Sequence, residues 1–167
     1  WGYGTSYTVV AANSLKTALG SDFGISKSPG FMESPSFVLQ ATAPSGEAFN
    51  FADCGSTNRG RVAVLMTWFA SKTGDDLYLD SEFFAKPENM GRMAAPGLIW
   101  LSQFEKKKSS SLTTQWHGNG KNPVAIFRDK ENDFYLGAKG GKAHLSHGNM
   151  DAGTFVFELN GVRWVID

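Results

Sequence analysis

The sequence predicts an α+β protein in which helices come first and antiparallel strands come second. Three features predict this class. Apolar residues recur at helical spacing up to about residue 104, short alternating segments bounded by Gly, Asn and Asp follow residue 109, and an Asn-Gly pair joins the last two of these segments. Because the two kinds of segment are separated along the chain, an interleaved βαβ arrangement is disfavoured. We expect a helical part over residues 1–108 and a strand part over residues 109–167.

Two helices are predicted most clearly in the first part. Residues 6–19 carry apolar side chains on one stripe, and Gly20 follows as a natural C′ residue, because glycine adopts a positive φ without steric cost. The second clear helix covers residues 60–71, where Val62, Leu65 and Trp68 lie on or near one stripe. Shorter helices are predicted at residues 36–43, 77–85 and 96–104. Residues 21–35 predict a loop rich in Gly, Ser and Pro, and residues 48–52 predict a short extended segment.

The second part predicts strands at residues 112–117, 123–128 and 133–137. The clearest signal is a hairpin around Asn160-Gly161, since alternating apolar residues precede and follow this pair and both turn residues tolerate positive φ. A hairpin is a poor place for a domain to finish, so we expect more sheet after Asp167.

Composition and charge narrow the functional classes. The 167 residues carry zero formal net charge, which removes the electrostatic argument for nucleic acid or an anionic membrane as a partner. No segment is apolar enough to span a membrane, so membrane insertion is not expected. The single cysteine, Cys54, excludes an internal disulfide but does not identify the compartment. The chain begins at Trp1 rather than Met, so a targeting segment could have been removed.

Four polar residues crowd into a short segment just before the last hairpin: His144, His147, Asn149 and Asp151. Histidine moves protons near neutral pH, and a nearby carboxylate can fix its tautomer or bind a metal. The alternative is a surface loop in which Asp151 forms a turn or fixes the backbone before Gly153. Local chemistry alone favours neither interpretation.

The segment SHGNMDAGTF, residues 146–155, resembles a signature of heparinase II/III-like polysaccharide lyases, in which two His, or His and Asn, precede Asp-Ala-Gly-Ser-Phe. The family's Asp at the end of the next strand is matched by Asp167. The opening WGYGTSY is similar to the start of a late helix in the family's (α/α) toroid, and FNFADC resembles the segment that follows it. Phe127-Arg128-Asp129 and Tyr135-Leu136-Gly137 resemble the first strands of the family's β-sandwich.

This resemblance implies that the chain is a piece of a secreted lyase, periplasmic or extracellular, that cleaves uronic-acid-containing polysaccharides by β-elimination. Such an enzyme must neutralise the uronate carboxylate, remove the proton at C5 and protonate the leaving oxygen. The resemblance implies that His147 matches the catalytic histidine. A toroid tyrosine commonly serves as base or acid; its match is expected upstream of Trp1, and Tyr3 and Tyr7 are the candidates present, with helix packing as their alternative role.

The resemblance also implies binding residues. Asp167 matches an Asp that helps to bind a structural zinc in several members, but Asn149 stands where those members often have a histidine, and an amide is a poor zinc ligand. Zinc or another divalent metal is therefore expected, if anywhere, in a longer parent protein. Candidate substrate-binding residues are Asn149, Trp1 and Arg128, with a loop contact and core packing as the alternatives for Asn149 and Trp1. For the other nearby basic residue, Arg163, two roles stay open: a clamp on a carboxylate and a solvent-facing position.

Two rival functions remain open. A non-catalytic glycan-binding relative would keep the fold, and Asn149 in place of histidine favours it. A purely structural domain would use the histidines only as loop residues. A glycoside hydrolase is disfavoured, because no pair of well-placed acidic residues is visible.

Overall fold

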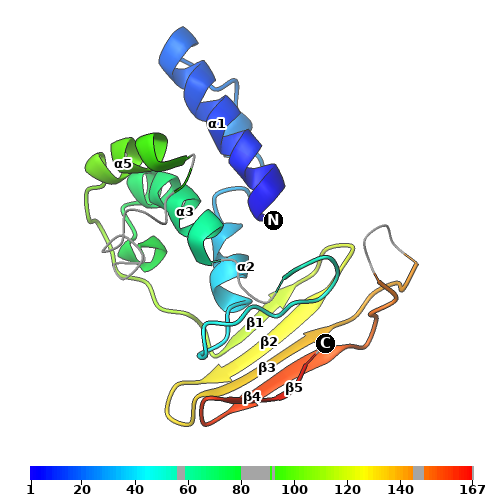
Figure 1. The fold of residues 1–167 in the computed structure, drawn as a ribbon. Coiled ribbons are helices and arrows are strands. Elements are labelled where there is room, and N and C mark those ends of the chain that lie inside the picture. Colours follow the sequence, from blue (N-terminus) through cyan, green and yellow to red (C-terminus); the bar gives the residue numbers. More distant parts are fainter. Residues whose placement is uncertain (56–58, 80–90, 92, 145–148, 167) are drawn as a thin grey trace. The chain divides into compact units, whose positions relative to one another are not determined.

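The computed structural model describes the chain except for residues 56–58, 80–90, 92, 145–148 and 167 (Figure 1). It divides into two compact units. The first is formed by Trp1–Pro35 and Arg59–Ser111, and the second by Ser36–Asn58 and Leu112–Asp167. Helices build the first unit and an antiparallel sheet builds the second, which confirms the predicted α+β class.

The helical unit contains α1 (Gly2–Leu19), α3 (Arg59–Thr73) and α5 (Ala94–Ser102), with 3₁₀ turns η1 (Ile25–Lys27) and η2 (Asp76–Tyr78). As predicted, α1 ends at Gly20, which has a φ of 73° and donates its N–H to the carbonyl of Lys16. The core of the helical unit combines aliphatic and aromatic side chains from all three helices: Val9, Leu65, Trp68, Phe69 and Trp100. Most of the helix expected at residues 77–85 lies outside the described residues.

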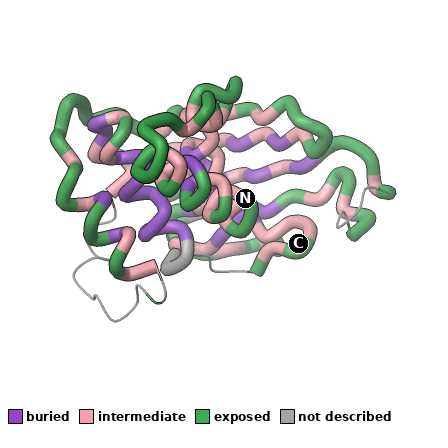
Figure 2. Tube along the Cα trace, turned by 90° about the horizontal axis from the view of Figure 1, so that it is seen from above, coloured by how far each residue is buried: buried purple, intermediate pink, exposed green. Residues whose placement is uncertain are grey.

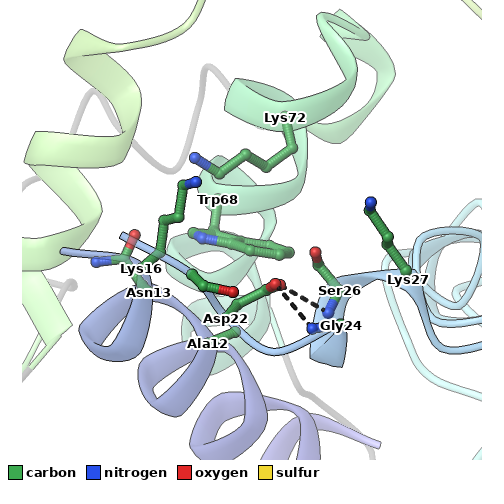
Figure 3. A pocket seen from close by; sticks show the side chains of 10 residues that line it. Ala12, Asn13, Lys16, Asp22, Gly24, Ser26, Lys27, Trp68 and Lys72 are labelled. Atoms are coloured by element: carbon green, nitrogen blue, oxygen red, sulfur yellow. Dashed lines mark hydrogen bonds between the residues drawn. The ribbon is translucent and has the colours of Figure 1, made fainter. Parts of the chain in front are cut away.

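The loop after α1 is organised by Asp22 (Figure 3). Its carboxylate accepts the backbone N–H groups of Gly24 and Ser26, at 3.1 and 2.9 Å. The hydrogen bonds from Ser26 contribute most to lowering the pKa of Asp22 to about 2. This turn holds Phe23 at a φ of 54°, with 71% of the residue exposed.

A second carboxylate, which is buried, ties η2 to the chain that follows α5. Asp75 is 1% exposed, accepts the N–H groups of Leu77 and Ser110 at 3.1 Å each, and forms an ion pair with Lys108 at 3.1 Å. Burial alone would raise the pKa of Asp75, but the hydrogen bonds from Ser110 and Leu77 and the contact with Lys108 outweigh it and lower the pKa to about 2.

The sheet is a five-stranded antiparallel meander in the order β1-β2-β3-β4-β5, with the bounds Gln115–Gly118, Val124–Asp129, Phe134–Lys139, Phe155–Leu159 and Val162–Val165. The predicted turn between the last two strands is confirmed, since Asn160 and Gly161 have φ values of 53° and 75°. A β-bulge lies in this last pairing, at Phe157/Glu158.

One face of the sheet is covered by α2 (Pro35–Gln40) and the loop that follows it. Ala41, Ala43 and Phe49 pack there against a cluster on the strands that includes Ile126 and Val156. Residues 48–52, expected to be extended, form no strand; Ala48 makes an isolated bridge to Thr42. The expected helical part over 1–108 included this segment, but its aromatic and alanine side chains are buried on the sheet.

The opposite face of the sheet is apolar and only partly covered. Along the strands, buried residues alternate with half-buried ones (Figure 2). The half-buried positions include Phe127, Leu136 and Phe157, which are cross-strand neighbours by register. On the same face of β4 and β5, Phe155 is 45% and Val162 is 49% exposed. This outer face therefore presents hydrophobic surface to solvent.

Gly137 makes the packing on the inner face possible. A Cβ at this position would lie 2.7 Å from Cδ1 of Phe49, so the ring packs directly on the backbone of β3. We predict that Gly137→Ala lowers the free energy of unfolding by about 2 kcal/mol, because the ring must shift in a packed core. Urea unfolding measures this. Gly120→Ala is the control, since a Cβ there meets nothing within 4 Å; equal losses for the two variants would contradict the steric argument.

The helical unit should lose stability in acid through Asp75. Because its folded pKa of about 2 lies below the ordinary value of 3.8, its contribution is complete above pH 4 and is lost as the pH falls towards 2. We expect Asp75→Asn to remove about 2 kcal/mol of stability at pH 7 and to flatten the pH dependence between 4 and 2. Urea unfolding at several pH values, followed by tryptophan fluorescence, measures both. Glu105→Gln, which removes an exposed charge from the same unit, should change neither.

Candidate functional site

The predicted site centres on the loop between β3 and β4, of which residues 145–148 lie outside the described residues. His147, the predicted catalytic histidine, and Asp167, the predicted metal ligand, both fall outside. The described part of this loop runs from Gly140 to an exposed His144 and resumes at Asn149 and Met150. The last two have φ values of 46° and 59°. Asparagine tolerates this conformation, whereas it is uncommon for methionine, so tertiary contacts must hold the backbone here.

One of these contacts is made by Asn149 itself. Its side-chain amide donates to Oδ1 of Asp53, at 3.3 Å, and thereby links the loop to the segment that covers the inner face of the sheet. This agrees with the alternative role of Asn149 as a loop contact. Its role in substrate binding stays a prediction.

Asp151 anchors the end of the loop more strongly. Its carboxylate accepts the N–H of Ala52 at 2.6 Å and forms a 2.5 Å ion pair with Lys139, the last residue of β3. The Lys139 side chain is fully buried and that of Asp151 is 6% exposed. The backbone adds two bonds, from Gly153 to the Lys139 carbonyl and from Thr154 to the Asp151 carbonyl. Asp151 therefore fixes the loop before Gly153, as one interpretation of the sequence proposed.

The ionised form of Asp151 is favoured. Burial on its own would raise the pKa of this carboxyl, but the hydrogen bond from Lys139 and the N–H of Ala52 outweigh burial and lower the pKa below its ordinary value. Asp151 therefore stays ionised near neutral pH in its ion pair with Lys139. Breaking it would leave a buried lysine without a counter-charge, which is far more costly than losing an exposed ion pair.

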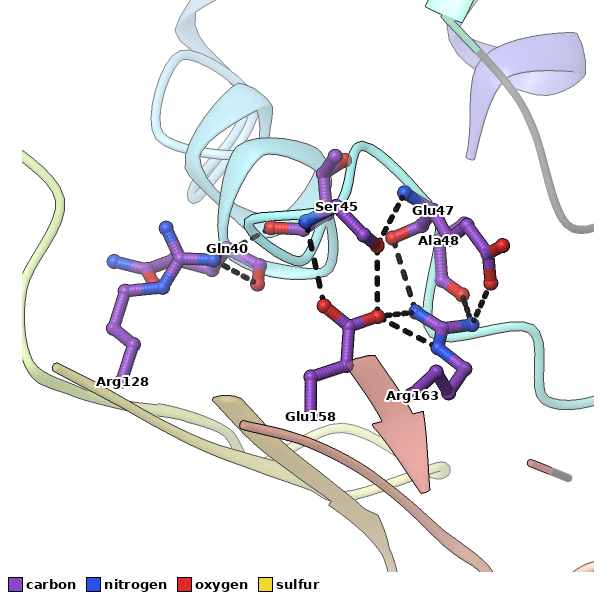
Figure 4. Close-up of polar contacts among 8 residues, drawn as sticks. Gln40, Ser45, Glu47, Ala48, Arg128, Glu158 and Arg163 are labelled. Carbon is purple, nitrogen blue, oxygen red and sulfur yellow. Dashed lines mark hydrogen bonds and ion pairs between the residues drawn. The ribbon is translucent and has the colours of Figure 1, made fainter. Parts of the chain in front are cut away.

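A second group of buried polar side chains crosses the inner face of the sheet. Four residues are successive cross-strand neighbours on β2 to β5: Arg128, Tyr135, Glu158 and Arg163. We call them the polar row. Figure 4 shows that the segment after α2 lies against Arg128, Glu158 and Arg163. The row thus connects four strands to the segment that covers them.

Glu158 and Arg163 form the core of this row. Arg163 donates from Nε to Oε1 of Glu158 at 2.7 Å and from Nη1 to the carbonyl of Ala48 at 2.9 Å, and its side chain is only 8% exposed. Ser45 donates its hydroxyl to the same Glu158 oxygen, at 2.8 Å. The solvent-facing alternative for Arg163 is therefore wrong. Alternation places it on the inner face, opposite the fully buried Glu158, which requires a counter-charge.

Arg128 occupies the other end of the row. Its Nη2 donates to the carbonyls of Thr42 and Gln40 at 2.5 and 3.4 Å, and its guanidinium lies 5.4 Å from the centre of the Tyr135 ring. Burial raises the pKa of Tyr135, so its phenol stays protonated near neutral pH. Both described hydrogen bonds of Arg128 end on main-chain carbonyls, a structural role; its predicted contact with substrate remains a prediction.

The aromatic candidates of the first unit differ from one another. Tyr3 and Tyr7 are 81% and 64% exposed, and their rings meet edge to face at 5.0 Å. Neither ring belongs to the core of the described helical unit, and packing against further helices stays a prediction for both. Tyr3 raises the pKa of Tyr7 above its ordinary value, first through a hydrogen bond and then through its proximity. Trp1, by contrast, is half-buried with its ring 6.0 Å from Phe69, which favours core packing.

The described residues do not fit a metal site. Among them, no three His, Cys, Asp or Glu side chains converge on a common point. The amide of Asn149 is engaged with Asp53, and Asp167 is not described. Within the same residues, no helix combines the length and apolar character needed to cross a membrane.

Sequence reasoning missed Lys139, Tyr135 and Glu158 as structural partners of the loop and of the two arginines. A signal existed for Glu158, which alternates with the apolar residues of the predicted hairpin, where a charge is either exposed or paired. Lys139 lies beyond the strand predicted at residues 133–137, so no such signal marked it. Comparison with known proteins adds nothing to these assignments: no protein-family model matches the chain, and no curated protein matches it significantly.

The ion pair of Asp151 generates a test. We expect Asp151→Asn to lower the free energy of unfolding by about 3 kcal/mol at pH 7, because Lys139 then stays buried without a counter-charge. The effect should shrink below pH 4, since the wild-type carboxylate is itself lost as the pH falls through its lowered pKa.

Urea unfolding at pH 7 and pH 3 measures both effects. Asp133→Asn is the matched control, because it removes an exposed carboxylate from the same unit. Adding Lys139→Met to Asp151→Asn should restore part of the loss. A double variant less stable than Asp151→Asn alone would show that the unpaired lysine is not the cause.

Proposed function

We propose that this chain is part of a polysaccharide lyase, periplasmic or extracellular, that cleaves uronic-acid-containing glycans by β-elimination. The observation that carries the proposal is the loop that bears His144, His147 and Asn149, whose end is fixed to the sheet by the buried Lys139–Asp151 pair. A buried ion pair is costly to form, so its use to fix a surface loop suits a loop with a positional task. The resemblance of residues 146–155 to the lyase signature suggests that this task is catalysis of β-elimination.

The reaction needs three groups. One neutralises the uronate carboxylate, so that C5 becomes more acidic; one removes the C5 proton; one protonates the leaving oxygen as the C4–O bond breaks and the C4–C5 double bond forms. In this proposal His147 is a proton-transfer group, since histidine exchanges protons near neutral pH. The proposal also assigns Asn149 a hydrogen bond to the substrate.

A tyrosine would complete the set. Tyr3 and Tyr7 are the candidates in this chain for proton donation to the leaving oxygen or for abstraction of the C5 proton. Their high exposure leaves both hydroxyls accessible. A tyrosine upstream of Trp1 remains part of the proposal as the family's usual position.

Exposed apolar surface supports the larger architecture. On the sheet, Phe155, Val162 and Trp164 are 45%, 49% and 67% exposed, as expected where a second sheet completes a sandwich. On α5, Leu98 and Ile99 are 52% and 56% exposed, as expected where a further toroid helix packs. The proposal therefore includes additional helices and strands that cover these surfaces.

One observation favours a second candidate, a glycan-binding protein without lyase activity. Asn149 replaces the histidine that the signature often carries, and its amide is held by Asp53. An amide can bind a sugar hydroxyl or carboxylate but cannot exchange protons near neutral pH. This candidate predicts binding of uronic-acid glycans without an unsaturated product.

The test uses the full-length protein that contains this chain, with His147→Ala and His144→Ala variants. Each is incubated with a panel of uronic-acid polysaccharides, and the ultraviolet absorbance of the unsaturated product is followed. We expect the wild-type protein to form product on at least one polymer, and His147→Ala to lose about 100-fold or more in rate. His144→Ala, the control in the same loop, should retain its rate within about threefold.

Each departure from this pattern has a meaning. Equal rates for wild type and His147→Ala would remove His147 from the mechanism. Glycan binding by calorimetry, with no absorbance change on any polymer, would replace the lyase by the second candidate. The absence of both binding and turnover would contradict both candidates and leave a structural domain.

A further inference from the structure

A pocket of about 330 Å³ lies within the helical unit, away from the histidine loop in sequence. It is formed between α1, the loop that Asp22 organises, and the C-terminal half of α3. Figure 3 shows the side chains that line it, with the Trp68 indole among Lys16, Lys72 and the Asp22 turn. We call it the lysine pocket.

The charge around this pocket is unbalanced. Lys16, Lys27 and Lys72 line it, and Asp22 is the one acidic side chain among its lining residues. Two backbone N–H groups of its own loop already occupy the Asp22 carboxylate, which the pKa of about 2 keeps ionised. Three ammonium groups and one carboxylate leave a positive excess of two charges. Gathering like charges costs energy that a bound anion would recover.

The lining contains donors and an aromatic surface. Trp68 is 2% exposed, and its Nε1–H is buried and finds no acceptor within the described part of the chain. The ammonium of Lys72 lies 5.8 Å from the centre of the same ring. A buried donor without an acceptor adds to the positive potential at this wall of the pocket, which again favours an anion there.

The rim carries an unusual residue. Phe23 lies between the lining residues Asp22 and Gly24, is 71% exposed, and has a φ of 54°, a conformation that bulky side chains seldom adopt. Two hydrogen bonds hold it there, because Ser21 Oγ accepts the N–H of Phe23 and Asp22 accepts that of Gly24. Phe23 is not itself a lining residue, but both of its neighbours in sequence are, so its exposed ring is available to a ligand that combines an anionic group with the apolar face of a pyranose ring.

We propose that the lysine pocket binds an anionic sugar, with the carboxylate or sulfate between Lys16 and Lys72 and the sugar ring against Phe23. The inference rests on the proposed function for its substrate class, an acidic glycan, and it adds a subsite remote in sequence from the residues assigned to bond cleavage. Because the lysines are exposed, we expect weak, salt-dependent affinity for a single sugar, in the millimolar range.

Nuclear magnetic resonance titration of the ¹⁵N-labelled protein tests the pocket without any readout of β-elimination. Glucuronate, glucose 6-sulfate, inorganic sulfate and neutral glucose are added separately, and the Trp68 indole and Gly24 amide signals are followed. We expect saturable shifts with one or both acidic sugars and none with glucose. Raising the sodium chloride concentration from 20 to 300 mM should weaken binding several-fold (about threefold or more).

Variants locate the site. Lys72→Met keeps the aliphatic stem and removes the charge, and should weaken binding by about threefold or more. Phe23→Ala should weaken binding of the acidic sugars but not of inorganic sulfate. Lys130→Met, an exposed lysine on the β2–β3 turn, is the matched control and should change nothing.

The outcomes separate this inference from the lyase assignment. Absence of saturable shifts, or equal affinities for wild type and Lys72→Met, would overturn the proposal that the lysine pocket binds anionic sugars. This holds even where the absorbance assay detects lyase activity. Inorganic sulfate binding as tightly as the sugars would overturn the sugar part and leave an oxyanion site. Sugar binding that Lys72→Met weakens would uphold the pocket even where no unsaturated product forms.

Discussion

The sheet unit depends on charges that its own fold removes from water. Lys139, Glu158 and Arg163 have side chains that are 0 to 8% exposed, and all three lie on the face that the segment after α2 covers. Such charges are tolerated only where each one is paired and hydrogen-bonded. The segment supplies those partners from Ser45, the carbonyl of Ala48 and the N–H of Ala52, with Asp151 completing the set. It is therefore part of the electrostatic core and not a connection passing over it.

The same pairing explains how the candidate loop is built. The loop leaves β3 at Lys139 and returns at Asp151, and the ion pair joins these two residues directly. Asn149 is tied to Asp53 on the covering segment. The residues between the two ends can vary in chemistry while the ends stay fixed, which is the usual arrangement of binding and catalytic loops on rigid scaffolds.

Local patterns predicted the local parts of this fold. The periodicity of α1 and α3, the C′ role of Gly20 and the Asn160-Gly161 turn depend on neighbours in sequence, and each was visible there. Long-range pairing was not. Alternation divides a strand such as Val162–Val165 into two faces, but the strand itself does not say which face is covered, so the sequence could not show that Arg163 is buried. For the same reason the chain pattern could not show that residues 36–54 belong with the sheet.

Burial in the structure also distinguishes aromatic residues whose roles composition alone could not tell apart. Tyr3 and Trp1 are both aromatic residues at the start of α1, yet one is exposed and the other packs on Phe69. The distinction depends on where α3 lies, which no local pattern contains. Candidate sites that rest on a pattern of adjacent residues, such as the histidine loop, were accessible to sequence reasoning, whereas the lysine pocket joins residues from three separate segments and was not.

During synthesis, the segment after α2 emerges long before the strands that it covers. Ser45 hydrogen-bonds Glu158 across 113 positions, and the carbonyl of Ala48 meets Arg163 across 115. At ordinary elongation rates, roughly ten seconds separate the emergence of the segment from that of its last partners. Its aromatic side chains Phe37, Phe49 and Phe51 stay unburied by the sheet in that interval, while the helical unit can already form. We therefore expect the nascent chain to pass through a state in which the helical unit is folded and the segment between its two sequence ranges still exposes apolar side chains. That segment should then depend on a chaperone to avoid aggregation.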